Sequence, residues 1–364
     1  MITAIVGSPT RTNLLLSRAW RQAGVDARVL WPNEALTTLR EGDVALARLD
    51  VLPTLDGVEP GLDAVPLLRD RGIRILNHPR ALLATHDKLL TAERLAAHAV
   101  PHPWTCLVRS HDDARDLVLP CVLKPRFGSW GQDVFRCRTP TELTDTLTRV
   151  GSRGWFERHG ALAQGLIEPA RRDLRVVVAG QRVVAAAERR AAPGEWRTNV
   201  SLGGRVSTTG VPAAARALAL GAIEATGIDL AGADLLPTDG GWIVLELNGA
   251  VDFDRRYALP GIDPYEAILE ALGIGQPGPH RLDDDEEAAM TKTVQGQPPR
   301  SGDEIVITGH AVGDAPRTAV ILEVLGEPGH ERYHVRWEDG HESIFFPADD
   351  AVIRRPSRRR TVTR

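Results

Sequence analysis

The sequence predicts a multidomain fold of the α/β and α+β classes, followed by a small β-barrel. Three observations support this prediction. Residues 1–84 alternate apolar strands with helical segments, strands dominate from Trp104 onward, and residues beyond Gly302 show short strands only. At 364 residues the chain also exceeds the length at which one hydrophobic core usually stops growing, so we expect more than one domain.

The composition is that of an ordinary globular protein, with 43% hydrophobic and 25% charged residues. A net charge of -4 gives no overall attraction to nucleic acid, so nucleic acid is not an expected partner of the main body. No segment predicts a membrane span, and the apolar start is expected to be a strand rather than a signal peptide. Cys106, Cys121 and Cys137 lack metal-ligand spacing, so we expect reduced thiols and a cytoplasmic location.

Residues 1–84 are predicted to form a parallel α/β domain, because short apolar runs are separated by helical patterns. The expected strands are Thr3–Val6, Ala27–Leu30, Val44–Ala47 and Ile73–Leu76, and the expected helices are Leu14–Gln22 and Ala64–Arg71.

Residues 85–160 and 161–274 are predicted to form two α+β subdomains. Asp87 is expected to cap a helix over Leu89–Ala97, and Pro101 and Pro103 mark a boundary after it. The other expected elements are strands Trp104–Val108, Cys121–Lys124, Val134–Cys137, Leu162–Ile167, Leu174–Val178, Arg182–Glu188, Leu230–Leu235 and Trp242–Leu247, and helices Pro212–Ala225 and Pro264–Leu272.

The carboxyl-terminal part changes in character. Residues 275–300 are rich in Gly, Pro and acid and predict a linker, whereas residues 301–354 have the spacing of a small barrel. Residues 355–364 are predicted to be a disordered basic tail that could contact polyanions weakly. The expected barrel strands are Glu304–Thr308, Thr318–Leu325, Tyr333–Trp337 and Glu342–Phe346.

The most informative motif is the segment Val122–Val134, in which a strand ends on Lys124 and a loop with Gly128 and Gly131 returns into another strand. Glycines let backbone N–H groups converge on an anion, and a lysine adds a compact positive charge for phosphates. A plain β-hairpin with a flexible loop is an equally good interpretation of this segment alone. It is not a Walker A loop, because no Lys-Ser or Lys-Thr pair follows the second glycine.

A second motif combines Asp234 with Glu246 and Asn248. Residues two apart on a strand share a face, so Glu246 and Asn248 project together and Asp234 can meet them from a neighbouring strand. Three oxygen donors of this kind suit Mg²⁺. The alternative is ordinary charges on a solvated sheet face, which the apolar surroundings disfavour.

A third group is basic and includes Arg175 beside Asp173, Arg189, and Arg197 with Asn199. Arginines near a metal and nucleotide site can stabilise phosphate oxygens through paired hydrogen bonds. Each of them taken singly is more simply a surface charge in this arginine-rich chain. Their position between the other two motifs favours the functional interpretation.

Together these motifs resemble the ATP-grasp superfamily, and within it the branch of the ribosomal-protein glutamate ligases and the lysine-biosynthesis carrier-protein ligases. The resemblance covers residues 1–272. It rests on an ordered set of segments: His86-Asp87-Lys88, Val122–Val134, Asp173-Leu174-Arg175, Ala185–Ala191, Arg197-Thr198-Asn199, Ala231–Asp234 and Glu246-Leu247-Asn248.

The resemblance implies an N-terminal α/β domain and two α+β subdomains that hold ATP between them, with Mg²⁺ as a further cofactor. Lys88 and Lys124 would contact phosphates, and the loop residues Gly128, Ser129, Gly131 and Gln132 would close over them. The other implied roles are adenine contact by Gln164, Gly165 and Leu166, ribose contact by Asp173, metal binding by Asp234, Glu246 and Asn248, and support of the triphosphate and acyl phosphate by Arg175, Arg189, Arg197 and Asn199.

Two departures from the family pattern bear on the substrates. The family often shows Gln-Glu-Tyr at the adenine hinge, where this chain has Gln164-Gly165-Leu166. After Asn248, Gly249–Phe253 resembles the lysine-biosynthesis branch rather than the Ser-Pro-Gly turn of the glutamate ligases. Arg48 and Asp50 are candidate amino-acid contacts, or equally strand-end surface charges.

Residues 302–353 resemble a small uncharacterised actinobacterial domain, which implies an SH3-like barrel. Trp337, Phe345 and Phe346 could form a recognition surface, although aromatics at strand spacing more often pack in a core.

The sequence therefore predicts an ATP-dependent, ADP-forming carboxylate-amine ligase that works through an acyl phosphate. Its partners would be ATP and an amino acid, or a carrier-protein or peptide substrate. Two alternatives stay open: an ATP-grasp protein without ligation that acts as a kinase, and a nucleotide sensor that interacts through its barrel.

Overall fold

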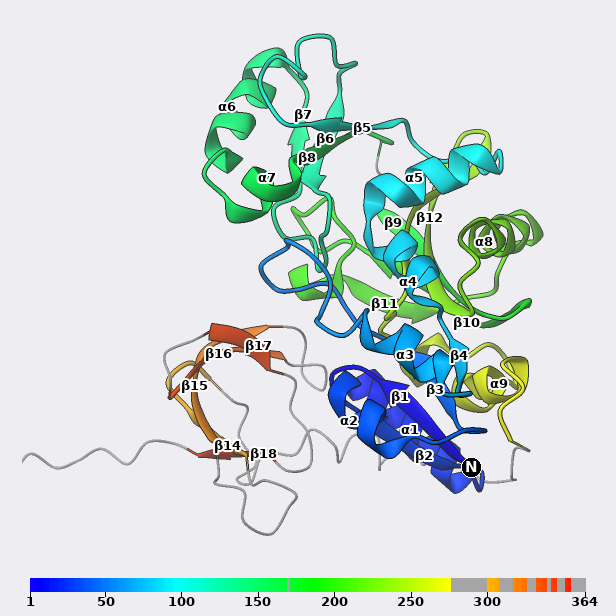
Figure 1. The fold of residues 1–364 in the computed structure, drawn as a ribbon. Coiled ribbons are helices and arrows are strands. Elements are labelled where there is room, and N and C mark those ends of the chain that lie inside the picture. Colours follow the sequence, from blue (N-terminus) through cyan, green and yellow to red (C-terminus); the bar gives the residue numbers. More distant parts are fainter. Residues whose placement is uncertain are drawn as a thin grey trace, which may run out of the picture. The chain divides into compact units, whose positions relative to one another are not determined.

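The computed structural model describes residues 1–168, 171–275, 300–307, 317–325, 332–338, 342–345 and 351–354. These residues form two compact units, a larger one that consists mainly of residues before 276 and a smaller one that consists mainly of residues after 299 (Figure 1). None of the described helices combines the length and apolar character needed to cross a membrane. Residues 276–299 of the predicted linker 275–300, and all of the predicted tail 355–364, lie outside the described residues.

The larger unit begins with a parallel four-stranded sheet of order β2-β1-β3-β4, as the sequence predicts. Parallel pairing brings the carboxyl ends of β1 and β3 together, so residues that follow these strands become neighbours. The elements are β1 (Ile2–Val6), α1 (Arg11–Gln22), β2 (Asp26–Leu30), α2 (Pro32–Thr38), β3 (Val44–Ala47), α3 (Ala64–Asp70) and β4 (Arg74–Leu76).

A second, antiparallel sheet has the order β5-β8-β6-β7. Helices α6 and α7 cover it, and Leu143, Leu147 and Trp155 pack against its buried strand residues (Figure 1). The elements are β5 (Thr105–Val108), β6 (Cys121–Pro125), β7 (Phe135–Cys137), α6 (Pro140–Val150), α7 (Gly154–His159) and β8 (Ala161–Gly165).

The third sheet is antiparallel with the order β11-β10-β9-β12-β13. Its elements are β9 (Arg172–Ala179), β10 (Arg182–Arg190), β11 (Arg205–Thr208), α8 (Ala213–Thr226), β12 (Leu230–Thr238) and β13 (Gly241–Asn248), followed by α9 (Pro264–Ala271). Two short 3-10 helices, Val200–Leu202 and Arg255–Tyr257, lie in its connections.

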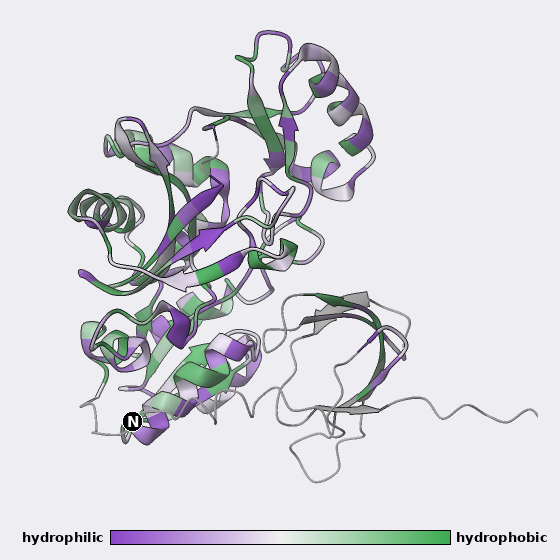
Figure 2. Cartoon of the chain, turned by 180° about the vertical axis from the view of Figure 1, so that it is seen from behind, coloured by the Kyte–Doolittle hydropathy of each residue, from purple (hydrophilic) through white to green (hydrophobic). Residues whose placement is uncertain are grey.

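One hydrophobic core joins the third sheet to the N-terminal sheet. Helices α4 (Pro79–His86) and α5 (Lys88–Ala97) place Leu82 and Leu95 in this core together with Val244. Helix α8, which Figure 2 colours as largely apolar, buries Ala215, Ala219, Ala222 and Ala225 in the same core. Because the core is continuous, the strand ends that carry polar residues are held at fixed positions.

Several elements escaped the sequence analysis: α2, α4, α6, α7, β11 and β18 (Ala351–Arg354). Helix α6 contains four threonines, which have low helix propensity, and is stabilised by its N-cap Thr139 and by Pro140 at its first position. Those two capping residues were the signal that could have identified it.

The smaller unit contains an antiparallel five-stranded sheet of order β17-β16-β15-β14-β18. Its other strands are β14 (Glu304–Ile307), β15 (Arg317–Leu325), β16 (Arg332–Trp337) and β17 (Glu342–Phe345). Trp337 is partly buried against the core formed around Ile305 and Tyr333, which favours the packing role. Phe346 lies outside the described residues, and the SH3-like barrel stays a prediction.

Candidate active site

A cavity of about 870 Å³, including its open mouth, lies between the second and third sheets. Its walls come from β6, the loop after β6, the end of β8, the segment after β10, and β12 and β13. The lining residues from the sequence-predicted set are Lys88, Lys124, Gly128, Ser129, Gly131, Gln132, Gln164, Gly165, Leu166, Arg197, Asn199 and Glu246. Apolar residues at one part of the wall include Val122, Leu236 and Leu245.

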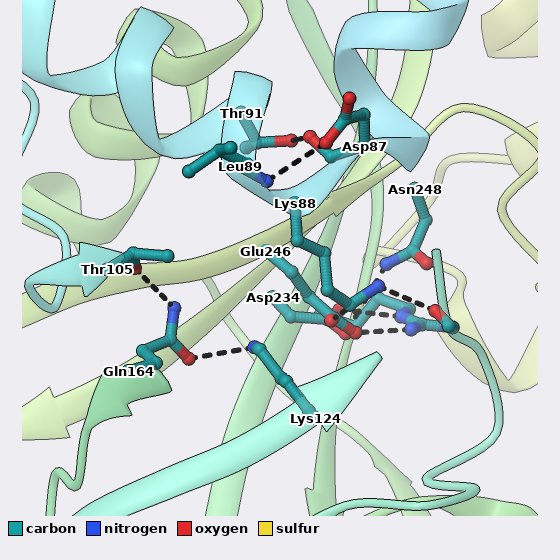
Figure 3. A network of polar contacts seen from close by, with 12 residues as sticks. Asp87, Lys88, Leu89, Thr91, Thr105, Lys124, Gln164, Asp234, Glu246 and Asn248 are labelled. Carbon is teal, nitrogen blue, oxygen red and sulfur yellow. Dashed lines mark hydrogen bonds and ion pairs between the residues drawn. The ribbon is translucent and has the colours of Figure 1, made fainter. Parts of the chain in front are cut away.

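Lys124 is fixed at the floor of this cavity. Its Nζ donates to Gln164 Oε1 at 2.8 Å, and Gln164 Nε2 in turn donates to Thr105 Oγ1 at 3.2 Å (Figure 3). Burial lowers the pKa of Lys124 to about 8, and the charge of Glu246 opposes this shift. The side chain is therefore a positive group in a rigid setting, held by a neutral acceptor.

Lys88 connects three elements around the cavity. Its Nζ donates to the Gly128 carbonyl at 2.6 Å and lies 3.4 Å from Glu246 Oε2 (Figure 3). Lys88 is the first residue of α5, where Asp87 accepts from the N–H groups of Leu89 and Leu90, as predicted. Helix, glycine loop and strand β13 thus converge on one ammonium group.

The loop after β6 is docked against the segment that follows β10. Arg197 Nη1 donates to the Gly131 carbonyl at 2.7 Å, and Ser201 Oγ donates to the Trp130 carbonyl at 2.8 Å. Gly131 has a φ of +72°, and a Cβ there would lie 2.8 Å from Asn199 Oδ1. The close approach of Asn199 and the positive φ explain why this position is glycine.

Five predicted residues, Asp173, Arg175, Arg189, Asp234 and Asn248, do not line the cavity. Four of them form a buried ion network on β9, β10 and β12. Arg189 Nε donates to Asp173 Oδ1 at 2.8 Å and its Nη2 lies 2.9 Å from Asp234 Oδ2. Asp173 also accepts from the Thr198 hydroxyl, and Thr198 does line the cavity. The network therefore supports the cavity wall from behind.

The predicted metal ligands lie together on neighbouring strands. Asp234 pairs with Glu246 in the register of β12 and β13, and Asn248 Nδ2 lies 3.5 Å from Asp234 Oδ2 (Figure 3). Across the described residues no three His, Cys, Asp or Glu side chains form a metal-binding group. Two carboxylates and an amide oxygen nevertheless have the hard-donor chemistry that suits Mg²⁺.

Trp104 is a residue of this region that the sequence analysis missed. A Cβ at Gly165 would lie 2.6 Å from Trp104 Nε1, and Gly165 N–H donates to the Trp104 carbonyl at 2.9 Å. The indole therefore occupies the place of a side chain at residue 165, which accounts for the glycine at the predicted adenine hinge. The tryptophan at the start of the predicted strand Trp104–Val108 was the available signal.

A family model described as a RimK-like ATP-grasp domain matches residues 85–272, slightly more than half of the chain. A model of a domain of unknown function (DUF1918) matches residues 299–353.

Among curated proteins, a probable alpha-L-glutamate ligase of Legionella pneumophila (strain Paris) is 32% identical over 237 residues, which cover 61% of this chain and 77% of that protein. A protein of the same name from Shewanella pealeana is 30% identical over 206 residues, and the match spans only 44% of its length and 55% of this chain. Among solved structures, the D-alanine--D-alanine ligase of Bacillus anthracis in complex with ATP has a TM-score of 0.55 at 16% identity, covering 74% of this chain and 95% of that one.

Proposed function

This chain belongs to the RimK-like ATP-grasp family, and we propose that this ADP-forming ligase joins a carboxylate to an amine through an acyl phosphate. The observation that carries the proposal is the cavity between the second and third sheets. It combines two lysines, a glycine loop and the acidic edge of β13 in one space of about 870 Å³.

The lining supports ATP as the occupant. Lys88 and Lys124 bring positive charge to one region, which suits a triphosphate, and Val122, Leu236 and Leu245 offer an apolar wall to a base. The glycine loop adds backbone N–H groups next to the lysines. The Asp173 carboxylate accepts hydrogen bonds from Arg189 and Thr198. We therefore assign Asp173 the role of positioning these two side chains rather than of contacting the ribose.

Glu246 and Asn248, together with Asp234, would hold Mg²⁺, which when bound neutralises charge on phosphate oxygens. Arg197 and Asn199 face the cavity from the segment after β10 and are the groups suited to stabilise the transferring phosphoryl group. Arg175 and Arg189 act indirectly, since they are bonded to carboxylates behind the wall.

In the proposed reaction a carboxylate oxygen attacks the γ-phosphorus and the bond to the ADP oxygen breaks. An amine nitrogen then attacks the acyl carbon, phosphate leaves, and the nitrogen loses a proton. Positioning and electrostatic stabilisation are sufficient for both steps, so no side-chain nucleophile is required. The name of the Legionella relative supports an amino acid as one of the two substrates.

The test is a screen of amino acids in pairs, with the full-length chain, Mg²⁺ and ATP. We expect ADP and phosphate to appear in step with a new amide detected by mass spectrometry. With hydroxylamine in place of the amine, the acyl phosphate should be trapped as a hydroxamate. AMP that rises in step with the amide would refute the acyl phosphate, and ADP without any amide or hydroxamate would identify a phosphotransferase instead.

A further inference from the structure

A second group of polar residues lies away from the nucleotide cavity, at the carboxyl ends of β1 and β3. It consists of Ser8, Arg48, Asp50, Glu59 and Asp252, which we call the Arg48 cluster. Asp252 follows β13 by four residues and is bound by the Thr12 hydroxyl of α1 at 2.9 Å. The chain thus leads directly from Asn248 to this cluster, which connects it with the proposed nucleotide site.

Arg48 is the central residue of the cluster and is only 2% exposed. Its Nε donates to Asn13 Oδ1 at 2.6 Å and its Nη2 donates to the Val251 carbonyl at 2.7 Å. Among the described residues, Nη1 has no hydrogen-bond acceptor. Because Asn13 and Val251 adjoin Thr12 and Asp252 in the chain, the guanidinium is held beside Asp252 with one donor unused.

A buried guanidinium N–H without an acceptor is unfavourable, so a site of this kind is suited to an incoming anion. A carboxylate is the group that matches a fixed guanidinium best. The unused donor of Arg48 therefore points to a ligand that carries a carboxylate.

The three carboxylates of the cluster accept hydrogen bonds from uncharged donors. Asp50 accepts from the Val51 N–H at 2.7 Å, and Glu59 accepts from the Asp50 N–H at 3.0 Å and from the Ser8 hydroxyl. Within the described ranges, no lysine, arginine or histidine forms an ion pair with Asp50, Glu59 or Asp252. Asp50, Glu59 and Asp252 are half-buried residues, so each keeps part of its surface accessible to a ligand.

The carboxylates of the cluster repel one another. Burial raises the pKa of Asp50 to about 7, and the neighbouring charges of Asp252 and Glu59 raise it further, while Arg48 opposes the shift. Burial also raises the pKa of Glu59. A cation bound among the three carboxylates would relieve this repulsion.

We propose that the Arg48 cluster binds the amine substrate of the ligase, and that this substrate is an amino acid with a cationic side chain. The inference rests on the proposed function. Arg48 Nη1 takes the carboxylate, and Asp50, Glu59 and Asp252 hold the two positively charged groups. One guanidinium against three carboxylates accommodates a ligand of net positive charge and repels an acidic amino acid, which distinguishes this chain from relatives named as glutamate ligases.

The test measures binding directly, by calorimetric titration of L-lysine, L-leucine and L-glutamate into the full-length chain with Mg²⁺ and a non-hydrolysable ATP analogue. We expect L-lysine to bind at least tenfold more tightly than L-glutamate, with L-leucine between them. Asp50→Asn and Asp252→Asn should each weaken L-lysine binding about tenfold, and Asn at these positions can still accept the hydrogen bonds from Val51 and Thr12. Affinity for the ATP analogue should not change.

Asp26→Asn is the matched control, because Asp26 is an exposed carboxylate at the opposite end of the same sheet, paired with Arg28. L-glutamate binding as tightly as L-lysine, or L-lysine affinity unaltered in both variants, would overturn the proposal. The titration measures binding without turnover, so it tests the amino-acid site independently of the ligase reaction. Amide formation in which glutamate supplies the amine would reject the charge selectivity alone, and selective lysine binding without ADP release would reject the ligase reaction alone.

Discussion

Arg175 on β9 donates two parallel hydrogen bonds to Asp234 on β12, with Nε–Oδ1 at 2.7 Å and Nη2–Oδ2 at 2.8 Å. The two residues are register partners on adjacent strands, so the pair is built into the sheet. Burial raises the pKa of Asp234, but the charges and hydrogen bonds of Arg175 and Arg189 lower it by more than burial raises it. The resulting pKa lies well below the usual range of an aspartate. Asp234 therefore stays ionised and is as much an anchor for two arginines as a candidate metal ligand.

Because Asp234 also holds two arginines, we expect its replacement to affect stability more than the replacement of Glu246 does. Replacing Asp234 by Asn should abolish turnover and also lower the free energy of unfolding by roughly 3 kcal/mol, because two buried guanidinium groups lose their counter-charge. Glu246→Gln should abolish turnover with a smaller loss of stability, because Glu246 lies 3.4 Å from one lysine and makes no paired hydrogen bonds to it, whereas Asp234 holds two buried arginines. Steady-state ADP release and urea unfolding measure the two effects. Wild-type turnover in Glu246→Gln at saturating Mg²⁺ would reject the metal assignment.

The lowered pKa of Lys124, about 8, predicts a pH dependence of nucleotide affinity. Phosphates favour the charged ammonium and raise its pKa in the complex, so affinity is highest below pH 8. It falls as the pH rises through the pKa of the free protein, by up to tenfold per pH unit. Equilibrium titration with an ATP analogue from pH 7.5 to 9.5 measures this slope.

Lys124→Met is the control for that slope. It should weaken the ATP analogue roughly 10- to 100-fold, as expected for the loss of a charge-assisted hydrogen bond. The remaining affinity should vary less with pH than in the wild type. An identical slope in Lys124→Met would assign the pH dependence to another group.

Gly131 provides a test of the loop that docks on Arg197 and Asn199. Gly131→Ala places a Cβ 2.8 Å from Asn199 Oδ1 at a φ of +72°, so the loop must shift away from its partner. We expect the KM for ATP to rise about tenfold. Gly24→Ala is the matched control, because Gly24 has a φ of +85° and nothing within 4 Å of the added Cβ. Equal effects of both variants on KM would mean that backbone strain, rather than loop docking, is responsible.

The sequence predicted the site best where the side chains that come together lie on a single strand. Residues two apart on β13 had to share a face, and the neighbouring strand had to bring Asp234 close, so the convergence of Asp234, Glu246 and Asn248 was predictable. The bounds of β9, β10, β12 and β13 were predicted to within a few residues because apolar runs in buried strands are continuous, whereas the exposed edge strand β11 was missed.

Pairing between side chains on different strands was not predictable. Whether Asp173 engages Arg175 or Arg189 depends on the register of β9 with β10, and that register includes an irregularity between Val183 and Ala185. The Trp104 indole at Gly165 depends on tertiary packing that no local pattern encodes. These contacts decide which predicted residues line the cavity and which support it from behind.

The smaller unit should be dispensable for nucleotide binding. All residues that line the cavity lie between Lys88 and Glu246 and belong to the larger unit. A chain that ends at Gly275 keeps α9 and the buried Ile274. It should therefore bind the ATP analogue with wild-type affinity, and its turnover with small substrates should stay within about twofold of the full chain.

A shorter truncation, at Ile262, is the contrasting variant. It removes Tyr265, which is fully buried and whose carbonyl accepts from Trp20 Nε1 at 3.0 Å, and it removes Leu269 from the core. Loss of two large buried side chains costs several kcal/mol, so this variant should unfold. If the chain ending at Gly275 is folded by circular dichroism but fails to bind the ATP analogue, the smaller unit contributes to the nucleotide site. If it binds the analogue yet no longer accepts a peptide or carrier-protein substrate that the full chain uses, the smaller unit serves substrate recruitment.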